Sequence, residues 1–280
     1  MPDSWCGILL AVHISDGFLS TPWWLGGFAL ASVMWIIGGW KIGEREIPRI
    51  GVVTAAFFVA SQVHLPTGVG TVHLVLNGLA GVLLHWRSAV AIGVGLLLQS
   101  LLFEHGGRTM IGVNCCIITL PAIAAGIAFP LLRRSKILHR PLVRGGLVGA
   151  LAASWSGLAI FATQLAMWQF RFGTSPTFDG LWLHQPLVWC VIGAIAISLA
   201  ILEQRLESDP DFALGLLLGA ATVAVTVVLK SAVLWLGGIG DWRALAAADL
   251  VAHTPVIVLE GIGVGFAVRV LAKAKPEWLA

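Results

Sequence analysis

The sequence predicts an all-α protein, a polytopic transmembrane helix bundle, and three observations support this prediction. Of the 280 residues, 58% are hydrophobic and only 11% are charged, whereas about a quarter of the residues of a water-soluble domain are charged. The mean hydropathy is +0.91. Apolar runs recur along the whole chain at roughly the 20 residues that cross a hydrocarbon core, without the strands of alternating polarity that indicate a transmembrane barrel.

Hydropathy delimits about nine candidate spans, some of them short. Because lipid cannot satisfy backbone polar groups, each span is expected to be helical. The third and fourth runs are separated by a single residue, so a re-entrant or tightly turned element is an alternative there, and seven or nine spans are both compatible with the sequence. In order, the candidate spans are 23–40, 50–63, 71–86, 88–103, 112–132, 143–169, 183–202, 213–237 and 252–272.

Charges between the spans predict the orientation of the chain. Lys and Arg cluster in three places, and the positive-inside rule makes these cytoplasmic. The N-terminus is then outside, the C-terminus is cytoplasmic, and the number of crossings is odd. The clusters are Lys41, Arg45 and Arg49 in the first loop, Arg133, Arg134, Lys136, Arg140 and Arg144 in a middle loop, and Arg269, Lys273 and Lys275 near the end.

Three polar segments that carry histidine are expected on the outer side. His13 lies in "AVHISDGFLS" and His105 in "FEHGGRTMIGVN". In "VHLPTGVGTVHLVLNG", which contains His64, Pro and Gly break regular structure, so this segment is expected to deliver His73 to the start of a helix, with Asn77 one turn below.

A transition metal is the ligand that these histidines favour. Each histidine taken singly is more typical of a membrane interface, but their convergence on one face favours a site. Neutral imidazoles with few carboxylates nearby suit nickel, cobalt or zinc, whereas calcium and magnesium require oxygen ligands.

Two charged side chains lie deep in the last two spans. Lys230 and Glu260 would each be costly to bury alone. A mutual ion pair, or a pair with His253, is expected to relieve that cost, and a structural pair is favoured over a proton pathway.

Catalysis and nucleic-acid binding are poorly supported. The sequence has no HExxH or GxSxG motif, and it lacks the P-loop GxxxxGK[ST], so this chain is not expected to hydrolyse ATP. A net charge of +3 does not indicate nucleic acid. Active transport would therefore need energy from partner proteins.

Several long motifs resemble the CbiM/NikM family, the substrate-binding membrane subunits of cobalt and nickel transporters of the energy-coupling factor (ECF) type. They are "VHISDGFLS", "GVGTVHLVLNGLAGVLL", "LLLQSLLFEHGGRTMIGVN", "VAHTPVIVLEGIGVGF" and a closing "KPEWL". The resemblance runs from about residue 12 to the C-terminus. It implies a multi-pass protein of a bacterial-type plasma membrane.

The resemblance also implies a ligand set. Family members begin Met-His and hold the ion with the terminal amine, the backbone nitrogen and imidazole of that histidine, and a loop histidine. Here these correspond to the amine of Val12, to His13 and to His73, with His64, Asn77 and His105 nearby. A planar set of four nitrogens favours Ni(II) and similar ions. Residues 1–11 would block the amine, so the working protein is expected to be a single domain, residues 12–280.

The partners that the resemblance implies are a transmembrane coupling subunit, two cytoplasmic ATPase subunits and a small accessory membrane subunit. The transported Co(II) or Ni(II) would be substrate, with no permanently bound cofactor; cobalt would supply cobalamin synthesis. Two alternatives remain at this stage. A vitamin-binding subunit of the same transporter class would need an enclosed apolar pocket, and a membrane enzyme would need the motifs that are missing.

Overall fold

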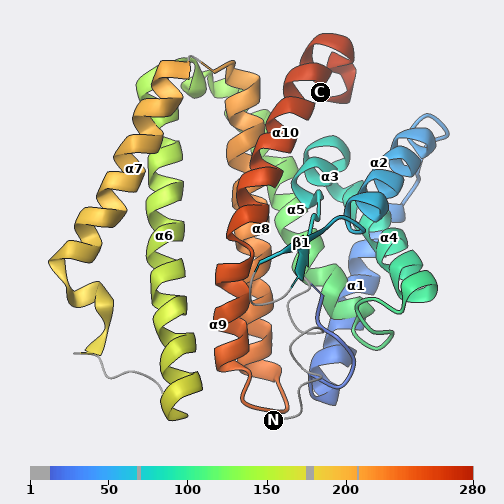
Figure 1. Ribbon diagram of the computed structural model, residues 1–280. Helices are drawn as coiled ribbons and strands as arrows, with labels where there is room; N and C mark the ends of the chain where they lie inside the picture. Colours follow the sequence, from blue (N-terminus) through green and yellow to red (C-terminus); the bar gives the residue numbers. More distant parts are fainter. Residues whose placement is uncertain (1–12, 68–70, 175–179, 207, 280) are drawn as a thin grey trace.

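The computed structural model describes residues 13–67, 71–174, 180–206 and 208–279. In this part of the chain nearly all regular structure is helical (Figure 1). The helices are α1 (Thr21–Gly39), α2 (Ile47–Ala60), α3 (Asn77–Leu84), α4 (Ser88–Phe103), α5 (Ile111–Ser135), α6 (Pro141–Phe172), α7 (Pro186–Leu206), α8 (Pro210–Gly237), α9 (Arg243–Ala252) and α10 (Thr254–Ala274). A hairpin pairs β1 (His64–Pro66) with β2 (Thr71–His73), and single 3-10 turns are η2 (His85–Arg87), η3 (Ile137–His139), η5 (Trp182–His184) and η6 (Pro276–Trp278).

By length and composition, seven helical segments among the described residues could cross a membrane, which confirms the all-α polytopic prediction. Large hydrophobic side chains cover their outer surfaces, as lipid contact requires; Leu142, Leu187 and Leu236 are each more than 70% exposed. The apolar α2, with 14 residues, is shorter. The seven segments are Thr21–Gly39, Asn77–Phe103, Ile111–Ser135, Pro141–Phe172, Pro186–Leu206, Pro210–Gly237 and Thr254–Ala274. One of them, Asn77–Phe103, is counted as α3, η2 and α4 together.

The segment Asn77–Phe103 is not one straight helix, because the chain reverses at η2. Arg87 pairs with Glu46 at the start of α2, and Gln99 bonds to Ser61 at its end, so α4 runs in the same direction as α2. The last turn of α3 lies at the same end of α2, because the carbonyl oxygen of Leu83 accepts a hydrogen bond from Arg49. Helix α3 therefore runs toward the start of α2, and α4 runs away from it. The tightly turned alternative therefore describes this region.

The expected span 71–86 is wrong as a continuous helix. Its first residues form β2, and only the eight residues of α3 are helical before the reversal. Leu76 before α3 and His85 after it have positive φ angles of 51° and 50°, a conformation that non-glycine residues rarely adopt. Hydropathy does not register such breaks, because the average over each window stays apolar.

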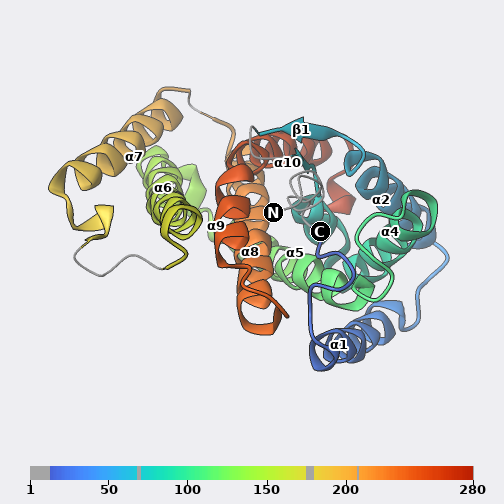
Figure 2. The same ribbon diagram turned by 60° about the horizontal axis from the view of Figure 1, so that its bottom comes forward.

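Helices α8 and α10 pack tightly at the centre of the bundle. A Cβ added to Gly215 of α8 would lie 2.8 Å from the Cα of Gly265 in α10, so the small residues let the two backbones approach. Figure 2 shows α6 and α7 on one side of this pair and α1, α2 and α4 on the other. Two helices from the C-terminal half of the chain therefore form the centre of the bundle.

Helix α10 finishes at the end of the bundle opposite the start of α1 (Figure 1). Several basic residues make contacts between elements at this end. Arg49 donates to the carbonyl oxygen of Trp278 in η6. Two ion pairs join helix ends in the same region: Arg133 with Asp211 at 2.9 Å, and Arg144 with Glu203 at 3.2 Å. Arg49, Arg133 and Arg144 belong to the basic clusters that the positive-inside rule assigns to the cytoplasm.

The expected pairing of Lys230 with Glu260 or His253 is wrong. Lys230 Nζ lies 2.9 Å from Asp249 in α9, and both side chains are 1% exposed. His253 contacts the same carboxylate at 3.4 Å. Glu260 instead accepts hydrogen bonds from backbone N–H groups of Val75 and Leu76. The Glu260 carboxylate lies at the start of α3 and accepts hydrogen bonds from N–H groups that have no partner within that helix. Lys230 and Glu260 are therefore each stabilised by a different group.

Candidate metal centre

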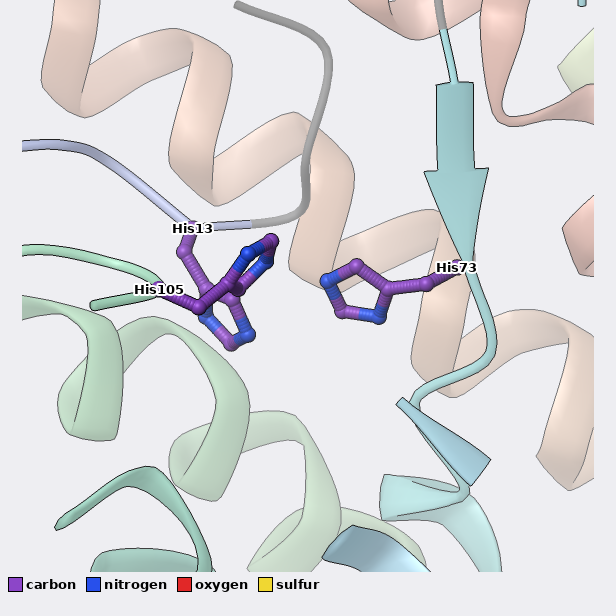
Figure 3. Close-up of side chains that lie close together, drawn as sticks. All are labelled: His13, His73 and His105. Atoms are coloured by element: carbon purple, nitrogen blue, oxygen red, sulfur yellow. The ribbon is translucent and has the colours of Figure 1, made fainter. Parts of the chain in front are cut away.

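Three histidines from three separate segments meet inside the bundle (Figure 3). The ring centroids of His13 and His73 are 4.9 Å apart, those of His13 and His105 are 5.1 Å apart, and those of His73 and His105 are 5.3 Å apart. One nitrogen from each ring lies within 4.8 Å of the others. His13 and His73 are 4% and 1% exposed. The structure therefore brings together three possible metal ligands, of which His13 and His73 are almost fully buried and His105 is half-buried.

The segment that carries His13 is fixed to the far end of α8. Leu19 forms an isolated antiparallel bridge with Gly238. Ser20 donates its N–H to Gly237 at 3.1 Å, and Ile239 donates to Phe18 at 3.0 Å. These backbone bonds hold the chain after His13 across the end of the bundle.

His73 is positioned by the hairpin and by Glu260. The ring Nδ1 lies 2.9 Å from the carbonyl oxygen of Leu74, so Nδ1 carries the proton and donates it. The lone pair is then on Nε2, which has no hydrogen-bond partner in the described part of the chain. The Glu260 carboxylate fixes the next two residues through their N–H groups. A carbonyl that orients a ligating imidazole in this way is typical of metal sites.

Two side chains join the His13 segment to the loop that carries His105. Asn114 accepts the N–H of Ile14 at 2.8 Å and donates to the carbonyls of Ile14 and Gly106, each at 2.9 Å. Asp16 accepts the N–H groups of Arg108 and Thr109, each at 2.9 Å. Asn114 and Asp16 are not among the residues that the sequence predicts for this centre. The signal that could have found them is their place as polar residues within the histidine-bearing motifs.

Burial keeps the three imidazoles neutral. It lowers the pKa of His13 well below 6.5, and the neighbouring His73 and His105 lower it further. Burial also lowers the pKa of His73 to about 3, although the hydrogen bond to Leu74 acts in the opposite direction. Burial and His64 lower the pKa of His105. Neutral imidazole is the form that binds a metal ion, so protons compete weakly here.

The other residues named from the sequence lie around this centre. His64 is exposed, opposite His73 in the hairpin. The Asn77 amide group donates to Thr226 at 2.8 Å and to the carbonyl of Ile118 at 3.0 Å, so these donors serve helix packing. His253 is buried, and its ring Nδ1 forms a hydrogen bond with the backbone oxygen of Asp249. Val12 and its amine lie outside the described residues, and so does the proposed extension 1–11.

Replacing Asn114 with alanine is expected to weaken metal binding by about 10- to 100-fold, the usual cost of losing a residue that positions a ligand. The substitution frees Ile14 and Gly106, and so loosens the backbone beside His13 and His105. Isothermal titration of the purified protein measures the affinity, and thermal unfolding reports whether the bundle remains folded. An affinity within threefold of the original, in a folded variant, would contradict this role.

Comparison with known proteins places the chain in a family. The family described as the cobalt uptake substrate-specific transmembrane region matches residues 13–203 and 187–278. A putative metal transport protein of Haemophilus influenzae is 36% identical over 147 residues, which are 52% of this chain and 69% of that protein.

Two further relatives carry more specific names. The fused nickel transport protein NikMN of Rhodobacter capsulatus is 32% identical over 177 residues, 60% of this chain and 48% of that protein. The putative cobalt transport protein CbiM 1 of Methanosarcina barkeri is 29% identical over 203 residues, 70% of this chain and 85% of that protein. The chain therefore belongs to the CbiM family of substrate-specific transmembrane regions for cobalt uptake.

Proposed function

We propose that this chain captures Co(II) or Ni(II) from the outer side of the membrane, as the substrate-binding subunit of an ECF-type importer. One observation carries the proposal. His13, His73 and His105 converge, and both ring nitrogens of His13 and the Nε2 atoms of His73 and His105 are buried without hydrogen-bond partners among the described residues. An unpartnered buried polar group costs free energy, and a bound metal ion would recover it.

The donor set indicates which ions fit. All three ligands are imidazoles, and the group contains no carboxylate. Calcium and magnesium prefer oxygen ligands, whereas first-row ions from cobalt to zinc accept imidazole nitrogen readily. The names of the nickel and cobalt relatives agree with this choice.

Orientation and energy supply follow from the rest of the chain. The basic end of the bundle suits the cytoplasm, which leaves the His13 segment facing outward. Since the sequence has no P-loop, we infer that two cytoplasmic ATPases act through a transmembrane coupling subunit, with a small accessory membrane subunit. Imported cobalt would supply cobalamin synthesis.

A native mass spectrum of the protein, expressed from its own gene start, tests the proposal. The expected result is one Co or Ni ion for each chain after loading with either metal. The same spectrum reports the N-terminal residue, and so shows whether a free amine at Val12 exists. A folded protein that stays free of both metals would contradict capture at this site.

A further inference from the structure

The segment that joins α5 to α6, residues 131–142 and here called the α5–α6 loop, carries three exposed cations. Arg134, Lys136 and Arg140 are all exposed, and no ion pair joins any of them to a carboxylate in the described part of the chain. The sequence has no Asp or Glu between Glu104 and Asp179. A negative partner for these side chains must therefore come from a distant part of the chain or from another molecule.

The described carboxylates of the neighbouring connection from α7 to α8 have other partners. Glu203 pairs with Arg144 at 3.2 Å. Asp211 pairs with Arg133 at 2.9 Å. The side chain of Asp209 accepts the N–H of Asp211 at 2.9 Å. These acidic groups are therefore not available to the three exposed cations.

The backbone of the α5–α6 loop is anchored to the bundle. Leu138 is 4% exposed and belongs to the hydrophobic core, and its carbonyl oxygen accepts a hydrogen bond from Arg144 at 2.9 Å. The hydroxyl of Ser135 donates to the carbonyl oxygen of Leu132 at 2.7 Å and accepts the N–H of Ile137 at 3.3 Å. Because the loop is already folded against the helices, binding a ligand would cost little in loop ordering.

Exposed aliphatic side chains lie beside the cations in the sequence. Leu131, Ile137 and Leu142 are 62%, 44% and 75% exposed. Helices α5 and α6 are both long and apolar enough to cross a membrane, so their connection lies where the hydrocarbon core meets the headgroups. An acidic protein surface or a nucleic acid would match the cations alone. An anionic phospholipid matches both kinds of side chain, since Lys and Arg reach its phosphate while aliphatic groups contact its acyl chains.

The basic loop before α2 has a different composition. In residues 41–49, Glu44 and Glu46 alternate with the cations, and Glu46 pairs with Arg87 at 3.1 Å. The guanidinium of Arg49 donates to two backbone carbonyls. The positive-inside rule counts both loops alike, but only the α5–α6 loop presents its cations without acidic residues between them.

We propose that the α5–α6 loop binds the headgroups of anionic phospholipids. The group that it recognises is a phosphate anion, and the lipid is its source. Near an anionic bilayer surface, each Lys or Arg contributes about fivefold to the attraction, so three such residues produce a clear preference over a zwitterionic lipid. The contacts are exposed, and salt therefore weakens the preference by screening.

Native mass spectrometry of the purified full-length protein tests the proposal. The protein is titrated with phosphatidylglycerol or with phosphatidylcholine of the same acyl chains. We expect phosphatidylglycerol to bind about tenfold more tightly or better, because only this lipid carries a net negative charge. An excess of inorganic phosphate should not displace it. In the triple variant Arg134→Gln, Lys136→Gln, Arg140→Gln, the two lipids should bind about equally.

The matched control is the triple variant Lys41→Gln, Arg45→Gln, Lys275→Gln, which removes the same net charge from three other exposed residues. It should keep the preference of the unaltered protein for phosphatidylglycerol. Thermal unfolding reports whether both variants are folded. The Co(II) affinity of the loop variant should equal that of the unaltered protein, since none of its three substitutions lies in the metal centre.

Four results would overturn the proposal and leave metal capture standing. Equal binding of the two lipids by the unaltered protein would point to a partner other than lipid, such as an acidic protein surface. Complete displacement by inorganic phosphate would indicate a site for the free anion. A folded loop variant that keeps the preference would place the lipid elsewhere. An equal loss in the control would assign the preference to net charge instead of to this loop.

Discussion

A variant in which His73 is replaced by alanine is expected to bind Co(II) or Ni(II) more weakly by about 100-fold or more, a loss at least as large as that for a positioning residue. His73 directs Nε2 toward His13 and His105, and its tautomer is fixed by Leu74. Without this ring, the remaining buried donors come from two segments only. Isothermal titration in detergent measures the loss.

The control for this prediction is His139→Ala, because His139 is an exposed histidine outside the metal centre. Its affinity should equal that of the unaltered protein. His13→Ala should reproduce the effect of His73→Ala, since both rings are almost fully buried in the same cluster. If a folded His73→Ala protein keeps its affinity within threefold, the ion binds elsewhere.

Much of the fold could be predicted because the membrane restricts the choices. Long apolar runs have to become helices, and the runs 112–132 and 213–237 correspond to α5 and α8 within a few residues. The region around α3 could not be predicted in this way. Leu76 has a positive φ angle where its N–H meets Glu260, a residue 184 positions away, and no local pattern signals that contact.

The candidate site was partly visible in the sequence for a related reason. Histidines are conspicuous in an apolar chain, so His13, His73 and His105 could be named before their convergence was known. The residues that hold them were harder to find. Asn114 acts through its amide group on the backbone of a segment 100 residues earlier, and only the folded chain shows this contact.

Asn77 shows that spacing along a helix does not by itself identify the partners of a side chain. Its place one helical turn below His73 gave it a role near the ligands, yet its amide group donates to Ile118 and Thr226. Periodicity predicts which residues share a helix face, but neighbouring helices determine what that face contacts. The same reasoning missed Asp249, a single carboxylate in an otherwise apolar stretch, four residues before His253.

Lys230→Met is expected to destabilise the protein by about 3–5 kcal/mol, because it leaves the Asp249 carboxylate without its ammonium partner inside the bundle. Both side chains are 1% exposed, and the pair joins the middle of α8 to α9. A charge in this position has neither water nor lipid headgroups to stabilise it. The thermal unfolding temperature in detergent should therefore fall, together with the yield of folded protein.

The double variant Lys230→Met, Asp249→Leu should recover much of this loss, because apolar side chains of similar volume replace a buried ion pair at little net cost. His253 keeps its hydrogen bond to the backbone oxygen of residue 249, at 2.8 Å. Lys275→Met is the matched control, since Lys275 pairs with Glu277 at 3.7 Å with both side chains at least 60% exposed. Such an exposed pair contributes about 0–1 kcal/mol. If Lys230→Met were as stable as Lys275→Met, the buried pair would not be what holds α8 against α9.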